Sequence, residues 1–400
     1  MNFVLLWSGL IASNVGTWVQ DVAEGWLVLQ LTNSPLWLGM LGLSFALPMV
    51  FLPIVGGAVV DRVRRVRLLY ITQTGMMAIS FLLALLTWMD LINVWCLLAA
   101  AFINASLLAF DNPARKALVP DLVPPRDLMN ALSLSAATYS GAALIGPAIA
   151  GVLIGPLGVG ALFFINGVSY FAVLIALKSM RDVPEVGSGV RVSFGRSMLT
   201  GLAYAFRTRL ILTLLILLAF MAVFGRSYRS LFPIFSRDIW QSGARGYGLL
   251  LSAAGGGALV GAFGLASIRH LKRQGAVMIG CGLTFSSSVI LFALSPSLGL
   301  GIICIFVGGV MATILGTVAA TFIQVEVPPA LRGRVLSLYT ITIIGLPALG
   351  ALGIGAIAES LGGIAGAPAA VLIGGIIVTV AFLLNAPFFW RRNALQRIND

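Results

Sequence analysis

The sequence predicts an all-α polytopic membrane protein with twelve transmembrane helices in two pseudo-symmetric six-helix bundles. First, the 400-residue chain is 59% hydrophobic and only 10% charged, whereas soluble domains carry about 25% charged residues. Second, its long apolar runs match the roughly 20 residues that a helix needs to cross the hydrocarbon layer. Third, the second half of the chain repeats features of the first. Ten-residue segments with strict alternation, which a β-barrel needs, are absent.

Twelve apolar runs are long enough to be spans. We expect them at residues 3–30, 36–60, 67–89, 93–111, 128–155, 159–178, 210–233, 246–267, 275–294, 298–323, 333–358 and 366–390. The first run lacks the basic start and the small-residue cleavage site of a signal peptide, so we interpret it as an uncleaved span.

The distribution of Lys and Arg predicts the orientation in the membrane. If the N-terminus is cytoplasmic, 21 of the 25 basic residues fall in inner loops or in the C-terminal tail. The four others lie in or just after the seventh span, at Arg226, Arg229, Arg237 and Arg245. The positive-inside rule therefore places both termini in the cytoplasm.

An internal repeat predicts the domain organisation. At an offset of 204 residues, Val123-Pro124-Pro125 matches Val327-Pro328-Pro329, and a series of glycines also aligns. We therefore expect an N-terminal bundle at 1–178, a cytoplasmic linker at 179–209 and a C-terminal bundle at 210–390, with a tail at 391–400. Apolar and basic residues alternate in the linker, which suggests an amphipathic helix on the inner membrane surface; a plain flexible linker is the alternative. Such parallel repeats around a midplane site are typical of secondary transporters.

Several classes of function are excluded by composition and motifs. The net charge of +12 comes from scattered residues that form no continuous basic face, so nucleic acid is not an expected partner. The three cysteines lie in apolar runs, and the single histidine has no neighbouring ligand, which leaves no metal site. No nucleotide-binding loop or catalytic motif is present, so we expect neither a cofactor nor an enzyme.

The loop between the second and third spans carries a family signature. Gly57-x-x-x-Asp61-Arg62-x-x-Arg65 resembles the signature loop of the major facilitator superfamily, although Arg64 stands where that family often has glycine. The resemblance extends over the whole chain. Short strings such as Ser13-Asn14-x-Gly16-Thr17-Trp18 and Pro113-Ala114-Arg115 look like the bacterial branch of enterobactin-exporter-like and macrolide-efflux-like proteins.

The resemblance implies an inner gate at this loop. In the family the carboxylate equivalent to Asp61 contacts the start of the eleventh span, where a helix N-terminus favours negative charge. Arg332 and Arg334 would add positive charge there. The predicted gate comprises Gly57, Asp61, Arg62, Arg65, Arg332 and Arg334. The alternative is that these arginines only set the topology.

Polar stripes on two spans predict the walls of a central cavity. Asn14, Thr17, Asp21 and Glu24 share one face of the first span by their spacing of three and four residues. A carboxylate inside a membrane span is costly, so this face should meet water, a proton or a cationic substrate; otherwise Glu24 lies in the headgroup zone. The tenth span carries a similar stripe of Thr313, Thr317 and Thr321, for which helix–helix hydrogen bonding is the alternative.

Other spans contribute further candidates. Arg226 and Arg229 lie at about the same depth as the acidic pair if the repeat holds, so they should pair with Asp21 and Glu24 or hold an anionic substrate group; the alternative is that they reach the outer headgroups. In the fourth span Asn104 is the main polar residue, and we expect no arginine embedded there.

The fifth span resembles the antiporter motif of drug exporters. Gly141, Gly146, Pro147 and Gly151 would allow close helix packing and a kink.

The family resemblance implies a transporter of the bacterial inner membrane that exports a small amphipathic compound, of drug or siderophore type, by proton antiport. The expected partners are this small molecule, protons and the bilayer, and the chain is expected to be monomeric. An importer or facilitator of the same fold is one alternative, and a non-transporting membrane scaffold or sensor is another.

Overall fold

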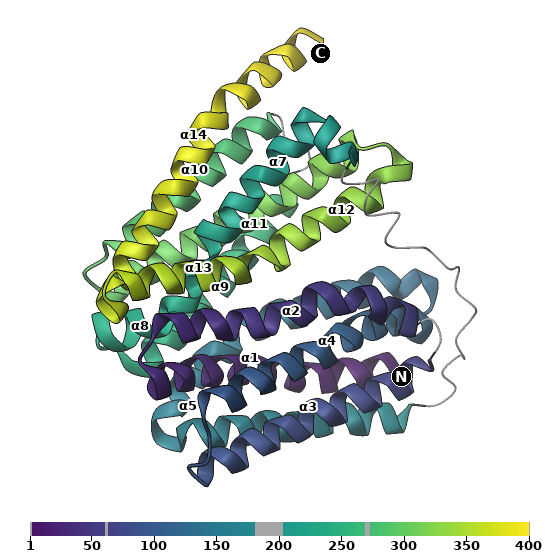
Figure 1. Ribbon diagram of the computed structural model, residues 1–400. Helices are drawn as coiled ribbons and strands as arrows, with labels where there is room; N and C mark the ends of the chain where they lie inside the picture. The colour runs from purple at the N-terminus through teal and green to yellow at the C-terminus, as the bar shows by residue number, and fades with distance from the viewer. Residues whose placement is uncertain (1, 61–62, 181–202, 269–272, 400) are drawn as a thin grey trace. The chain divides into compact units, whose positions relative to one another are not determined.

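The computed structural model describes residues 2–60, 63–180, 203–268 and 273–399, and within these ranges it contains helices and no strands (Figure 1). The first half of the chain forms α1 to α5. Their bounds are α1 Asn2–Thr32, α2 Pro35–Val60, α3 Arg65–Trp88, α4 Val94–Leu122 and α5 Leu128–Ser179, with the short 3₁₀ helix η1 Pro125–Asp127 before α5. The expected linker helix lies mostly outside the described residues.

The second half begins with a helix of mixed type and continues with regular helices. The mixed helix comprises α7 Arg209–Phe220, η2 Met221–Arg226, η3 Ser227–Leu231, α8 Phe232–Ile234 and η4 Phe235–Ile239. The later elements are α9 Gly243–Ala266, α10 Gln274–Ala293, α11 Leu298–Glu326, α12 Pro329–Ile344, α13 Leu346–Ser360, η5 Gly363–Gly366 and α14 Ala367–Asn399.

The chain divides into two compact units, which follow the sequence halves except for two short segments. Unit 1 comprises Met1–Asn33, Met40–Val192 and Ser242–Ser252. Unit 2 comprises Ser34–Gly39, Ser193–Gln241 and Ala253–Asp400. The start of α9 therefore belongs to unit 1, although it comes from the second half of the sequence.

Helix lengths agree with the predicted number of spans. Ten helical stretches of the described residues are long and apolar enough to cross a membrane. One of them, Pro125–Ser179, is 55 residues long and is broken at Gly158, whose φ of 75° places it in the left-handed region that glycine tolerates. This stretch holds the fifth and sixth predicted spans, and α1, which is less apolar because of its polar stripe, completes the twelve.

Short turns with defined chemistry end several helices. Asn33, Asp90 and Gln241 have positive φ values and lie where one helix stops and the next begins. The Asn93 side chain accepts a hydrogen bond of 3.0 Å from the backbone N–H of Cys96 and so caps α4. These signals explain why the ends of the spans near residues 33 and 90 agree closely with the sequence prediction. Near residue 241 the agreement is poorer, because the seventh span was expected to end at 233 and η4 continues to Ile239.

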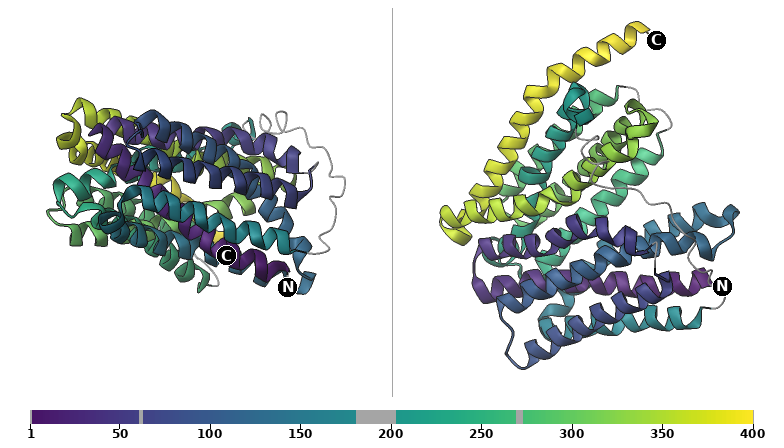
Figure 2. Two further views of the ribbon diagram at one scale, coloured as in Figure 1. Left: turned by 90° about the horizontal axis from the view of Figure 1, so that it is seen from below. Right: turned by 45° about the vertical axis from the view of Figure 1, so that its right-hand side comes forward.

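In unit 1, α1 packs along α5, and α3 packs against both α4 and α5, an arrangement that can be followed in both views of Figure 2. Close approach depends on small residues. A Cβ atom at Gly9 would lie 2.9 Å from the carbonyl oxygen of Ala172, so α1 and α5 touch through their backbones there. At one end of this bundle a cluster that includes Leu6, Leu69 and Leu118 forms the apolar core.

In unit 2, α10 packs against α11 and α14. Gly282 on α10 accommodates the Phe382 ring of α14, because a Cβ atom at this glycine would lie 2.0 Å from the ring. The mixed helix α7–η4 packs against α13 and α14. The span predicted at 210–233 lies within the helical stretch Arg209–Ile239, and the chain changes from α to π and 3₁₀ geometry in its middle.

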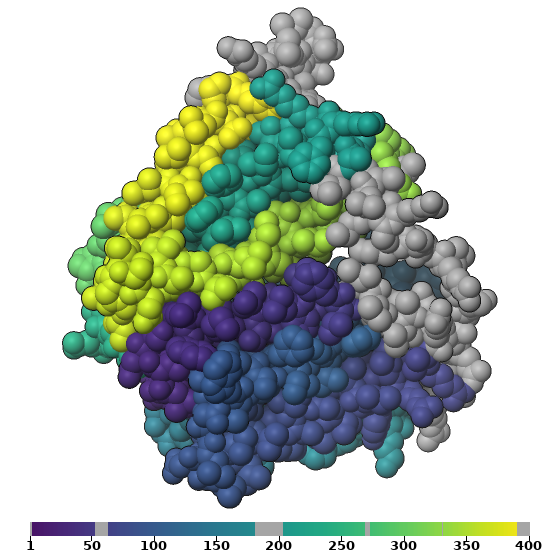
Figure 3. All heavy atoms as spheres, in the orientation of Figure 1, coloured from purple at the N-terminus to yellow at the C-terminus, as the bar shows by residue number. Residues whose placement is uncertain are grey.

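The outer surface of unit 1 is apolar, as a lipid-facing surface requires. Figure 3 shows α2, α3 and α4 lying side by side on one face of this unit. Leu82 on α3 is 53% exposed and Phe102 on α4 is 46% exposed. Large exposed apolar side chains at this density fit a hydrocarbon environment and would be unfavourable in water.

Candidate functional site

The stripe on α1 meets two different environments inside unit 1. Asp21 is exposed, and no hydrogen bond or ion pair joins it to the described residues. Glu24 is only 6% exposed and accepts a hydrogen bond of 2.8 Å from the Nε2 of Gln20. The two carboxylates thus differ in their surroundings: Asp21 is accessible to a mobile partner, whereas Glu24 is held in place by a hydrogen bond.

A buried polar network behind α1 fixes the orientation of Glu24. The Oε1 of Gln20 accepts hydrogen bonds of 2.7 Å from both the Ser80 hydroxyl on α3 and the Asn166 amide on α5. This leaves the Gln20 amide nitrogen directed at Glu24. Sequence reasoning missed these residues, although Gln20 lies one turn before Glu24 on α1. Ser80 and Asn166 come from α3 and α5, and only the fold brings them to Gln20.

Aromatic side chains lie close to the α1 carboxylates. The Trp18 and Tyr139 rings are 6.2 Å apart, and the Trp26 and Tyr247 rings stack at 6.4 Å. A Cβ atom at Gly25, between Glu24 and Trp26, would lie 2.7 Å from the Tyr247 hydroxyl. Tyr247 therefore reaches α1 directly from the start of α9, within unit 1.

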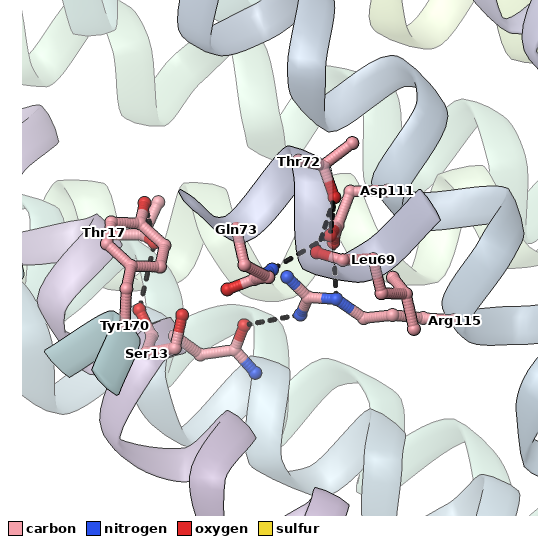
Figure 4. Close-up of polar contacts among 9 residues, drawn as sticks. Ser13, Thr17, Leu69, Thr72, Gln73, Asp111, Arg115 and Tyr170 are labelled. Atoms are coloured by element: carbon pink, nitrogen blue, oxygen red, sulfur yellow. Dashed lines mark hydrogen bonds and ion pairs between the residues drawn. The ribbon is translucent and has the colours of Figure 1, made fainter. Parts of the chain in front are cut away.

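A second charged cluster lies within unit 1 and contains an arginine embedded in α4 (Figure 4). Asp111 is fully buried, and its Oδ1 accepts hydrogen bonds of 2.8 Å from the Thr72 hydroxyl and from the Gln73 amide, both on α3. Its Oδ2 lies 2.5 Å from the Nε of Arg115, one turn later on α4. The buried carboxylate is thus satisfied from three sides.

Arg115 extends from this cluster towards α1. Its Nη1 donates a hydrogen bond of 3.4 Å to the Oδ1 of Asn14, the first residue of the predicted stripe. The expectation that the fourth span holds no arginine was wrong. The span was expected to end at residue 111, but α4 continues to Leu122 through Pro113 and Pro120, so Asp111 and Arg115 lie inside the helix.

The side chains of Asn104 and Thr17 make few polar contacts with the described residues. The Oδ1 of Asn104 is buried without a hydrogen-bond partner among the described residues. The Thr17 hydroxyl lies 2.9 Å from the carbonyl oxygen of Ser13 and 3.5 Å from the Tyr170 hydroxyl (Figure 4). Thr17 therefore belongs partly to the polar contacts between α1 and α5.

The predicted inner gate is only partly described. Asp61 and Arg62 lie outside the described residues, and Gly57 is part of α2. Arg65 forms an ion pair with Asp121 near the end of α4 and donates a hydrogen bond of 3.0 Å to the carbonyl oxygen of Ala117. This pair ties the start of α3 to the end of α4 within unit 1.

The second half of the predicted gate lies at the start of α12. The Arg332 Nε donates a hydrogen bond of 3.0 Å to the carbonyl oxygen of Val327 in the preceding turn, and Arg334 is also engaged in an interaction. A contact between this region and Asp61 would join the two units and stays a prediction.

The threonine stripe of α11 satisfies itself locally. The Thr317 hydroxyl donates to the carbonyl oxygen of Thr313 at 2.9 Å, and the Thr321 hydroxyl donates to that of Thr317 at 3.0 Å. Thr317 and Thr321 are both exposed. Their role in a cavity wall stays a prediction.

Arg226 and Arg229 lie in the irregular part of the seventh span, at the end of η2 and in η3. Both side chains are partly buried, and no carboxylate of the described residues in unit 2 forms an ion pair with either. π-helical turns of this kind are frequent at functional sites. The predicted pairing with Asp21 and Glu24 would join the two units and stays a prediction.

The glycines of the antiporter-like motif differ in their surroundings. A Cβ atom at Gly146 would lie 2.6 Å from that of Trp18, and one at Gly151 would lie 2.9 Å from the carbonyl oxygen of Ala244 at the start of α9. Gly141 has open space around it. Pro147 lies in the same packed region of α5, so two of the three glycines are sites of close approach.

Comparison with known proteins decides the family. The family model described as transmembrane secretion effector, of the major facilitator superfamily, matches residues 1–391. The chain belongs to this family. It is therefore a member of the major facilitator superfamily of transporters.

Relatives of this family member include siderophore transporters. The chain is 25% identical over 345 residues to the staphyloferrin A transporter of Staphylococcus aureus, covering 81% of each chain. It is 27% identical over 334 residues to the enterobactin exporter EntS of Shigella boydii, covering 82% of this chain and 78% of the relative.

Solved structures confirm the fold. The nucleoside transporter NupG superimposes with a TM-score of 0.77 at 15% identity, covering 96% of this chain and 99% of that one. An inward-facing, unoccupied bacterial homologue of the lysosomal transporter Spinster gives 0.74 at 17% identity, covering 98% and 96%. At these identities the likeness speaks for the two-bundle transporter fold alone.

Proposed function

We propose that this family member exports a small siderophore-type organic compound from the cytoplasm by alternating access coupled to proton antiport. The siderophore transporters among its relatives support the substrate type, and the family description supports secretion. The observation that carries the coupling is the pair of carboxylates on α1, with Glu24 buried and held by Gln20. A buried carboxylate in a membrane helix favours the protonated form and is suited to take up and release a proton.

In this proposal the protein is monomeric and lies in the bacterial inner membrane with both termini in the cytoplasm. The first six spans and the last six spans act as the two bundles, and the segment 179–209 connects them. The gate residues Gly57, Asp61, Arg62 and Arg65 control access from the inner side, together with Arg332 and Arg334.

The test is transport into everted membrane vesicles that are acidified inside. An iron-free siderophore of the type handled by the relatives is expected to accumulate several-fold more with the proton gradient than after its collapse. Glu24→Gln is expected to abolish this stimulation, because the amide cannot exchange a proton, and Asp21→Asn is expected to reduce it. Accumulation that ignores the gradient in the wild type contradicts antiport.

Asp90→Asn is the matched control. Asp90 is an exposed acid in the turn between α3 and α4, with a φ of 56° that asparagine tolerates. This variant should transport like the wild type. If Glu24→Gln retains full proton-coupled transport, the coupling role of α1 is lost, whereas gradient-driven movement only into the cytoplasm would favour an importer of the same fold.

A further inference from the structure

Arg226 and Arg229 lie in a segment in which the residues just before Arg226 pack against neighbouring helices. A Cβ atom at Gly350 on α13 would lie 2.1 Å from the carbonyl oxygen of Val223, and one at Gly374 on α14 would lie 2.5 Å from that of Phe224. Gly225 receives the Phe285 ring of α10 in the same way. Positions 223–225 thus face α10, α13 and α14.

Arg226 lies within electrostatic range of a further helix, α12. It interacts electrostatically with Tyr339 on α12, whose hydroxyl donates a hydrogen bond of 2.8 Å to the carbonyl oxygen of Gly316 on α11. Arg229 is close to the Tyr228 hydroxyl. Tyr228 is itself fixed, because its ring packs edge-on against Phe232 at 5.3 Å and Phe292 at 5.5 Å. Both guanidinium groups therefore belong to a segment whose backbone is held in place by packing against neighbouring helices.

Among the described residues of unit 2, no carboxylate forms an ion pair with Arg226 or Arg229. Its sequence contains four acidic residues, and all lie near helix ends or at the terminus: Asp238, Glu326, Glu359 and Asp400. Asp238 forms an ion pair of 3.0 Å with Arg237, and Glu359 accepts a hydrogen bond of 2.8 Å from Ser34. Two cations in a membrane helix without an anionic partner are costly, so this pair requires an anion from outside unit 2.

We propose that Arg226 and Arg229 form an anion-binding subsite that holds a carboxylate group of the transported compound. Each guanidinium offers five N–H donors in a planar arrangement that suits bidentate binding of a carboxylate. This inference rests on the proposed function in naming the transported compound as the ligand, but binding at the subsite can be measured without transport.

The experiment uses the purified full-length protein in detergent, with citrate as the probe and neutral trimethyl citrate as its uncharged counterpart. Binding is followed by isothermal titration calorimetry. Wild-type protein is expected to bind citrate and to bind the ester at least about tenfold more weakly, because hydrogen bonds between charged groups are lost. Arg226→Gln and Arg229→Gln are each expected to weaken citrate binding by about tenfold or more.

Two variants separate charge from folding. Arg226→Lys keeps the charge but loses the bidentate geometry, so it should bind citrate with an affinity between those of the wild type and Arg226→Gln. Arg245→Gln removes an exposed arginine at the start of α9 and should leave citrate binding unchanged. All variants are first required to elute as the wild type does in size-exclusion chromatography.

Equal binding of citrate by the wild type, Arg226→Gln and Arg229→Gln would overturn the subsite, as would equal binding of citrate and its ester. Absence of citrate binding by the wild type would overturn it as well. These outcomes do not affect the interpretation of the vesicle assay. Failure of gradient-driven export in that assay would overturn the proposed function, and the result on anion binding would remain valid.

Discussion

At the scale of single residues, the charged groups of unit 1 fall into two types. The carboxylate of Asp111 is held by contacts with Thr72, Gln73 and Arg115. Asp21 is exposed and has no such partner in the described structure. The contacts of Asp111 join α3 and α4, whereas Asp21 is available for a ligand or a proton.

The pair Asp111–Arg115 provides the first prediction. Asp111→Ala should lower the free energy of unfolding by about 3–5 kcal/mol, because it leaves Arg115 charged and partly buried without its partner. The double substitution Asp111→Ala with Arg115→Ala should cost less than the sum of the two single ones. Thermal unfolding in detergent, with all four proteins compared, measures this coupling. Additive losses would show that the ion pair contributes nothing beyond its separate parts.

At the scale of secondary-structure elements, the start of α9 depends on the absence of a side chain. A Cβ atom at Gly248 would lie 2.3 Å from the carbonyl oxygen of Pro147 and 2.9 Å from the Cα of Gly151. Both neighbours are backbone atoms of α5 and cannot rotate away. The antiparallel contact of these two helices therefore tolerates only glycine here.

A substitution at this contact tests its importance. Gly248→Leu should destabilise the packing of α9 on α5 by about 1–3 kcal/mol or more and should abolish transport in vesicles, because the side chain forces the two backbones apart. Gly264→Ala is the control on the same helix, since nothing lies within 4 Å of its Cβ position. A wild-type melting temperature and normal transport for Gly248→Leu would show that close packing of α9 on α5 is needed neither for stability nor for transport.

At the scale of the whole molecule, sequence reasoning predicted the class and the number of spans correctly. Apolar runs and the aligned repeat depend on local composition, which the membrane imposes on each span separately. The extent of α4 was missed because Pro113, Asp111 and Arg115 read as a loop, whereas buried partners on α3 allow them inside a helix.

The candidate site was predicted less completely than the fold. The spacing on α1 identified Asn14, Asp21 and Glu24 on one face, because helical periodicity is visible in the sequence. It could not identify Asn166, since the role of this residue depends on a partner on another helix, Gln20 of α1. The change to π geometry before Arg226 also has no local sequence signal.

The orientation of the chain gives a prediction for the molecule in its membrane. In a variant without its native cysteines, Asp90→Cys and Ser360→Cys should react with a membrane-impermeant maleimide in intact cells, because Asp90 lies in a turn and Ser360 at a helix end that are both expected on the outer side. Arg126→Cys, in an expected inner turn, should react only in everted vesicles. Labelling of Arg126→Cys from outside would reverse the predicted topology.

The segment Ser242–Ser252 has a consequence for how the protein could be divided. It is covalently part of the second half of the chain, yet it places Tyr247 against Gly25 and Gly248 against Gly151 in unit 1. A cut in the region 181–202 would therefore produce two fragments. The first would lack Ser242–Ser252, which packs in unit 1, and the second would carry this segment. Such fragments should each be aggregation-prone alone and recover activity only when produced together. A cut after residue 252 would not avoid this, because the first fragment would then carry Ser193–Gln241, which belongs to unit 2.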